Sequence, residues 1–110
     1  EMIKFIKILA VSVFWIVWTN IAVHADEFDS VKMKWNTCAA CHGNEAQGKP
    51  GFPSLNWMEE DYIVEALTDY KQMITRGDMS GIMFGQAATL SDEEVALMAK
   101  YIKVLNNGED

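Results

Sequence analysis

The stretch "NTCAACHGNE", residues 36–45, holds both cysteines of this 110-residue chain. Cys38 and Cys41 are separated by two residues, and His42 follows the second cysteine directly. Two thiols and an imidazole at this spacing are used for disulfide exchange, for metal binding or for attaching a prosthetic group. The remainder of the chain indicates which of these three kinds of chemistry applies.

The pattern Cys-x-x-Cys-His is typical of covalent attachment of a c-type haem. A thioredoxin-like redox pair would need strands alternating with helices, and no β-rich run precedes Cys38. A closed structural zinc site would need four ligands, whereas residues 26–110 contain two cysteines and one histidine. The sequence therefore predicts thioether bonds from Cys38 and Cys41 to one haem, with His42 as the proximal ligand of its iron.

The sixth ligand of that iron is predicted to be a methionine. The one other histidine lies near the N-terminus, and methionine opposite histidine is the arrangement of electron carriers. Met73 and Met98 fall on apolar faces of predicted helices, which favours core positions. Met58, at a helix entry, and Met79 and Met83, in a Gly-rich segment between helices, remain as candidates.

The first 25 residues predict export from the cytoplasm. Two lysines precede an apolar run over residues 8–18, and a small residue, Ala25, ends the segment, as in a cleaved secretory signal peptide. The alternative is a retained N-terminal membrane anchor, because residues 5–23 are nearly long enough to span a bilayer. Both alternatives place residues 26–110 in the periplasm, either soluble or membrane-anchored.

The predicted exported part is strongly acidic. Without Glu1, Lys4 and Lys7 it keeps 15 acidic and seven basic side chains, a formal charge of −8. Nucleic acids require a basic face, so they are excluded as partners. The charge instead predicts redox partners with a basic docking surface.

The remaining patterns are helical, with no convincing strand. We expect helices over residues 28–38 and 58–76, the second stopped by Gly77, and a last helix from Ser91. Ser91 and Glu94 have the spacing of a capping box. The Gly- and Pro-rich residues 43–56 predict a loop after the cysteine motif.

Three segments occur in an order that resembles the small class I c-type cytochromes of bacteria: "CAACHG" (38–43), "GFPSLN" (51–56) and "MFGQAATLSDEEVALMAKYI" (83–102). The resemblance covers roughly residues 33–104. It implies an all-α class I cytochrome c fold, with three to four helices around one covalently bound haem, as the domain of residues 26–110. It also implies Met83 as the sixth ligand, seven residues before Leu90, with Met79 as the runner-up.

The resemblance assigns further roles near the haem. The carbonyl group of Pro53 is expected to accept the Nδ1 proton of His42, which fixes the ring and raises its donor strength. Tyr101 is expected where the first and last helices cross. Three aromatic residues are expected to pack against the haem or near it: Trp57, Tyr62 and Tyr70.

One position departs from the family. A large apolar residue often lies four places before the first haem cysteine, and here that residue is Lys34. Trp35 or Met33 is expected to take over its packing role.

The function implied is that of an electron-transfer protein rather than an enzyme. It would move single electrons between exported or membrane partners, as in a respiratory chain. Similarity to halves of dihaem cytochromes and to the cytochrome subunits of sulfide-oxidising flavocytochromes leaves a haem subunit of a larger redox complex as an alternative. If no methionine binds the iron, a five-coordinate haem sensor or a peroxidatic protein is the third hypothesis.

Overall fold

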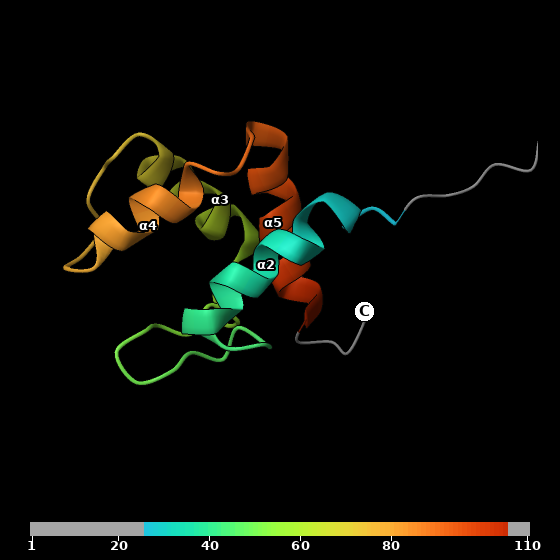
Figure 1. Ribbon diagram of the computed structural model, residues 1–110, viewed down its shortest axis with the longest axis horizontal. Helices are drawn as coiled ribbons and strands as arrows, with labels where there is room; N and C mark the ends of the chain where they lie inside the picture. Colours follow the sequence, from blue (N-terminus) through green and yellow to red (C-terminus); the bar gives the residue numbers. More distant parts are fainter. Residues whose placement is uncertain (1–25, 106–110) are drawn as a thin grey trace, which may run out of the picture.

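The computed structural model of the protein describes residues 26–105, which form four helices and no β-strand (Figure 1). The helices are α2 (Asp29–His42), α3 (Glu60–Lys71), α4 (Ser80–Ala87) and α5 (Asp92–Leu105). None of them is both long and apolar enough to cross a membrane. The predicted signal peptide or anchor, residues 1–25, lies outside the described residues. The prediction of an all-α fold is confirmed for the part of the chain that the structure covers.

The first and last described helices, α2 and α5, pack across each other (Figure 1). The ring of Tyr101 on α5 lies 5.2 Å from that of Phe28 and 6.4 Å from that of Trp35, centroid to centroid. Trp35 is buried, whereas Met33 is 80% exposed. Tyr101 therefore occupies the crossing as predicted, and Trp35 takes the packing role left by Lys34.

Helix α5 begins with the predicted capping box. The backbone N–H of Ser91 donates to Glu94 Oε1 at 3.0 Å, and the N–H of Glu94 donates to Ser91 Oγ at 3.1 Å. These reciprocal bonds satisfy two N–H groups that the helix start would otherwise leave without a partner. The prediction of a helix starting at this pair is confirmed.

Helix α3 ends at Lys71, earlier than the stop predicted at Gly77. Ile74 N–H donates to Asp69 O at 2.8 Å and Met73 N–H donates to Tyr70 O at 3.0 Å, the bonds of a Schellman motif. Met73 holds the left-handed position of this motif, with φ 61°, and is 74% exposed. The prediction that Met73 is a core residue was therefore wrong, because the helix ends before that position.

The Gly-rich segment that was expected to be a loop contains helix α4. Glycine lowers helix stability, and Gly81 and Gly85 lie inside this helix. The helix is held by packing on α3, where the rings of Tyr70 and Phe84 lie 6.2 Å apart. Tertiary packing thus outweighs local propensity at this segment.

Candidate haem site

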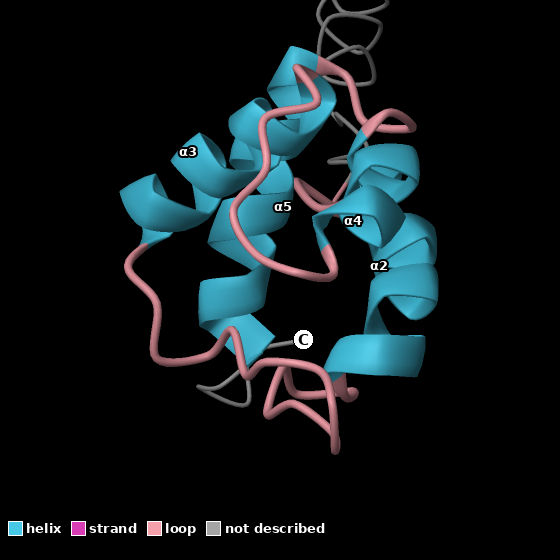
Figure 2. Ribbon diagram, turned by 90° about the vertical axis from the view of Figure 1, so that its left-hand side faces the viewer, coloured by secondary structure: helices cyan, strands magenta, loops and turns pink. Residues whose placement is uncertain are grey.

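A cavity of about 640 Å³ lies among the four helices and is also lined by the loop after α2 and by the connection between α3 and α4. Figure 2 shows these elements arranged around the interior, with the loop of residues 43–59 beneath them. The lining is largely hydrophobic and includes Leu55, Ile63, Leu67 and Leu90. Volumes of about 300–1,000 Å³ are usual for ligand and cofactor sites.

Both cysteines lie on the last turns of α2 and line this cavity. Cys38 and Cys41 are three positions apart in a helix, so their side chains share one face. Both are half-buried, and no disulfide joins them. Burial raises the pKa of the Cys38 thiol, whose sulfur lies 3.6 Å from the carbonyl oxygen of Lys34. The helix therefore presents two adjacent thiols to one apolar space.

His42, the last residue of α2, is buried and also lines the cavity. Its Nδ1 lies 2.8 Å from the carbonyl oxygen of Pro53, the atom that the family resemblance assigns to it. A carbonyl oxygen only accepts hydrogen bonds, so Nδ1 carries a proton, and in the neutral imidazole Nε2 keeps a free lone pair. The imidazole is thus oriented and prepared as a metal ligand.

The loop after His42 folds back tightly and brings the Pro53 carbonyl group within hydrogen-bond distance of the ring. Gly48 N–H donates to the carbonyl oxygen of His42 at 2.6 Å, and Gly48 has a φ of 85°. A Cβ at this position would lie 2.8 Å from the backbone nitrogen of Ser54. Glycine is therefore required at residue 48 both by the backbone conformation and by the close approach of the returning chain.

The three candidate sixth ligands that the sequence left open all lie at the cavity, whereas Met73 does not line it. Met58, Met79, Met83 and the buried Met98 contribute to the lining. Met83 lies within α4 and is half-buried, and Met79 directly precedes that helix. Since they are four positions apart, both belong to the same side of the segment. The geometry therefore keeps Met83 and Met79 as candidates together, and Met58 remains a third.

Two of the three predicted aromatic residues, Tyr62 and Tyr70, line the cavity. Trp57 does not contribute to the lining and is 68% exposed, so the prediction that it packs there was wrong. Arg76 also lines the cavity, although the sequence reasoning did not select it. It is the only arginine of the chain, which was a signal available in the sequence.

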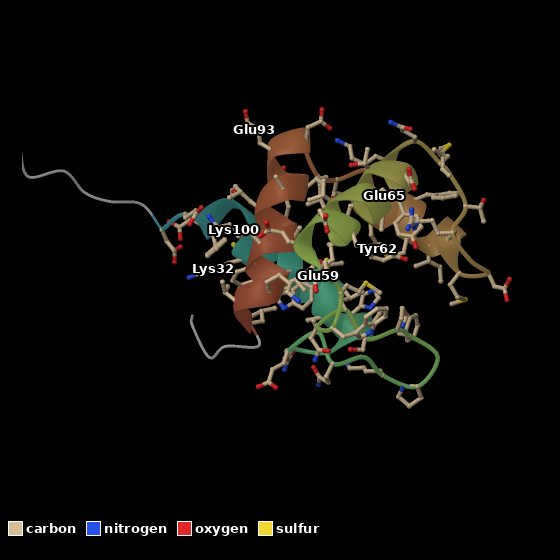
Figure 3. The ribbon with its side chains drawn as sticks, turned by 180° about the vertical axis from the view of Figure 1, so that it is seen from behind. Lys32, Glu59, Tyr62, Glu65, Glu93 and Lys100 are labelled. Carbon is tan, nitrogen blue, oxygen red and sulfur yellow. The ribbon has the colours of Figure 1, made fainter. Side chains whose placement is uncertain are left out.

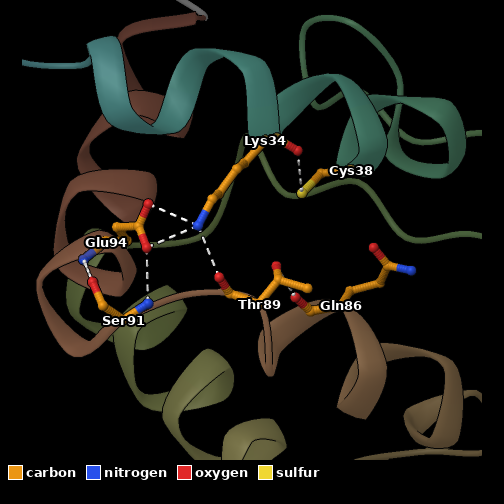
Figure 4. Close-up of polar contacts among 6 residues, drawn as sticks. All are labelled: Lys34, Cys38, Gln86, Thr89, Ser91 and Glu94. Atoms are coloured by element: carbon orange, nitrogen blue, oxygen red, sulfur yellow. Dashed lines mark hydrogen bonds and ion pairs between the residues drawn. The ribbon is translucent and has the colours of Figure 1, made fainter.

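Lys34 joins α2 to the connection between α4 and α5, next to Cys38 (Figure 4). Its Nζ donates to the carbonyl oxygen of Thr89 at 2.8 Å and to Glu94 Oε1 at 2.9 Å. The Ser91 N–H and the Lys34 ammonium lower the pKa of Glu94. A charged residue therefore bridges two elements at a position where the family often has an apolar one.

Comparisons with known proteins point to one family. The family model described as Cytochrome c matches residues 32–106. Cytochrome c-554(548) of Halomonas halodenitrificans is 35% identical over 69 residues, 62% of this chain and 83% of that protein. Cytochrome c4 of Thiocapsa roseopersicina is 33% identical over 72 residues, which are 63% of this chain.

A third relative is the Cbb3-type cytochrome c oxidase subunit FixP of a Bradyrhizobium species, 33% identical over 81 residues and 64% of this chain. The matched region spans 38% of the length of cytochrome c4 and 27% of the length of FixP. The similarity thus covers most of one relative and a minor part of two others.

Proposed function

Because the chain belongs to the cytochrome c family, we propose that it is a one-electron carrier whose haem iron is bound by His42 and Met83. The family assigns it a small class I fold, one covalently attached haem c and electron transfer rather than catalysis. The proposal adds the two axial ligands, thioether bonds to Cys38 and Cys41, and Pro53 as the partner of the proximal imidazole.

The observation that carries the proposal is the 2.8 Å contact between His42 Nδ1 and Pro53 O in the cavity that both cysteines line. It leaves Nε2 as the free donor and raises its donor strength. Bound haem supplies the one-electron Fe(III)/Fe(II) couple. The apolar lining excludes water, and a methionine opposite histidine favours the reduced state, which raises the reduction potential.

The absorption spectra of the matured protein, oxidised and reduced, with and without carbon monoxide, test this proposal. A low-spin spectrum that carbon monoxide leaves unchanged is expected for a closed His/Met site. Full carbon monoxide binding by the reduced protein would contradict the proposal and favour the five-coordinate sensor or peroxidatic protein.

We also propose that residues 1–25 direct export to the periplasm and that residues 26–110 are the cytochrome domain. The intact mass of the protein isolated from the periplasm or the membrane checks this division. A mass that starts at Asp26 supports a cleaved signal peptide, whereas retention of residues 1–25 in the membrane fraction supports an anchor.

A second candidate, a haem domain within a larger redox complex, is favoured by two of the relatives. The similar region is 38% of cytochrome c4 and 27% of FixP, whose name makes it an oxidase subunit. Co-purification of the tagged protein with an oxidase or another haem protein from mild detergent would support this candidate. Isolation as a single small haem protein, with no second subunit, would support the independent carrier.

The partner of either form is proposed to carry a basic docking surface, because residues 26–110 have a formal charge of −8. The rate of electron exchange with a basic redox protein should fall steeply as ionic strength rises, while exchange with an acidic one should rise. Rates that do not depend on salt would contradict charge-guided docking.

A further inference from the structure

Arg76 lies in the segment between α3 and α4, and its side chain reaches back onto α3. The guanidinium donates to Asp69, lies 3.7 Å from Glu65 Oε1, and stacks 5.0 Å from the ring centre of Tyr62. These three residues are three and four positions apart, so they share one face of α3. Figure 3 shows Tyr62 and Glu65 on the side of α3 that is nearer to α4 in that view.

The backbone of Arg76 holds the other side of the connection, the start of α4. Arg76 N–H and Gly77 N–H donate to the Ser80 hydroxyl oxygen at 2.8 and 2.9 Å, and that hydroxyl donates to Gly77 O at 2.7 Å. Ser80 is buried and is the first residue of α4. Its hydroxyl therefore uses its one proton and both lone pairs. One residue thus joins the face of α3 to the first turn of α4.

Helix α4 needs such an anchor because it is weak by itself. It has eight residues, two of them glycine, no charged side chain and no side-chain cap at Met79. Isolated helices of this length are unstable in water, so the position of α4 depends on what holds it. Among the described helices its main neighbour is α3, the helix that the Arg76 side chain contacts.

We propose that Arg76 is a positioning residue for the sixth haem ligand. Its side-chain contacts with Asp69, Glu65 and Tyr62 hold its backbone in place on α3, and that backbone in turn binds Ser80. These contacts therefore keep Met83, three residues further along α4, at the cavity. The inference rests on the proposed function, in which Met83 binds the iron. Two carboxylates accompany the guanidinium, so its contribution is the placement of α4 rather than a net positive charge near the haem.

Competition by imidazole for the sixth position of the ferric holoprotein tests the proposal. R76Q keeps a polar side chain but loses the charge-assisted bonds, so the apparent affinity for imidazole should rise about fivefold. The sulfur-to-iron charge-transfer band, which reports methionine on the ferric iron, should disappear from R76Q at a correspondingly lower imidazole concentration. R76K keeps the positive charge but lacks the planar guanidinium with its several donors. Its apparent affinity for imidazole should therefore lie between those of the parent and R76Q. An unchanged imidazole affinity in R76Q would overturn the proposal.

Two control variants separate positioning from general stability. V95A removes buried core volume at a residue of α5 that does not line the cavity, so it should unfold at a lower denaturant concentration yet bind imidazole like the parent. K100Q removes an exposed ion pair with Glu27, at the part of the molecule away from α4, and should change neither property (Figure 3). If V95A raised imidazole affinity as much as R76Q, the effect would be global and the proposal would be wrong.

Failure of the inference is distinct from failure of the proposed function. If the parent ferric protein lacks the sulfur-to-iron band, or M83A keeps it, then Met83 is not the ligand and both fail. If the parent shows the band and M83A loses it, while R76Q matches the parent in imidazole affinity, only the positioning role of Arg76 fails.

Discussion

The contact between His42 and Pro53 decides which imidazole nitrogen is free to donate. The residue types in "CAACHG" and "GFPSL" were enough to anticipate this pair, because the motif fixes the histidine and the family pattern supplies the proline. What the sequence could not supply is the path between them. That path depends on a backbone turn at Gly48 that only glycine adopts easily.

Replacing Gly48 by alanine should destabilise the protein strongly. The residue has φ 85°, and the new Cβ would lie 2.8 Å from the Ser54 nitrogen, a backbone atom that cannot turn aside. Gly51 is the matched control, since it has the same φ of 85° but nothing within 4 Å of an added Cβ. Urea unfolding of the holoproteins should show a loss of about 1–2 kcal/mol for G51A from the backbone alone. G48A should lose clearly more unfolding free energy than G51A. Equal losses would show that the close approach of the added Cβ to the Ser54 nitrogen does not affect stability.

The choice between Met83 and Met79 can be made by single substitution. Met83→Ala should abolish the sulfur-to-iron charge-transfer band of the ferric protein and allow the reduced protein to bind carbon monoxide, because the sixth position opens. Met79→Ala removes a thioether from the same side of the segment and should keep the parent spectrum. The opposite pattern would assign the ligand to Met79.

The ends of helices show where sequence patterns succeed and where they do not. The Ser91–Glu94 capping box placed the start of α5 correctly, because both partners of the bonds are side chains that a sequence reveals. The end of α3 was placed too late, because its Schellman motif has Met73 where glycine is usual. Helix α4 was missed for a related reason, since its stability comes from α3 and not from its own residues.

Met73→Gly should therefore stabilise the protein. Glycine adopts the left-handed conformation without the cost that Met73 bears at φ 61°, and the exposed side chain contributes little burial. Allowing for the extra freedom of glycine in the unfolded chain, a gain of about 0.5–1 kcal/mol in unfolding free energy is expected. Met33→Gly is the control, because Met33 is similarly exposed but lies inside α2, and it should lose about 1 kcal/mol. Loss of stability in both variants would contradict the motif.

Several carboxylates of the molecule favour the ionised state when folded, which gives stability a definite dependence on pH. Hydrogen bonds from Lys32 and Phe28 lower the pKa of Asp26, Lys71 lowers that of Asp92, and Ser91 N–H with Lys34 lowers that of Glu94. A carboxyl with a lowered folded pKa contributes stability above its unfolded pKa and loses it as pH falls through the folded value.

The melting temperature should accordingly be flat near neutral pH and fall from about pH 5 downward. Glu94→Gln removes one of these groups, so its melting temperature should lie below the parent's at pH 7 and approach it at pH 3. Glu93→Gln removes an exposed carboxylate from the same first turn of α5 (Figure 3), so the difference between the two variants isolates the bonds that Glu94 makes with Ser91 and Lys34. A constant difference between Glu94→Gln and the parent at every pH would show that Glu94 acts by packing and not by charge.

Because the methionines differ in exposure, the extent of oxidation at two of them can serve as a reference for oxidation at the others. Met73 is 74% exposed and Met98 is 1% exposed, so mild peroxide should convert the first to its sulfoxide and spare the second in the same molecule. A thioether sulfur that donates its lone pair to iron reacts more slowly than its exposure alone would allow. Peptide mass spectrometry of peroxide-treated samples could then follow the occupancy of the iron–sulfur bond in whole cells, with Met73 and Met98 as the upper and lower references.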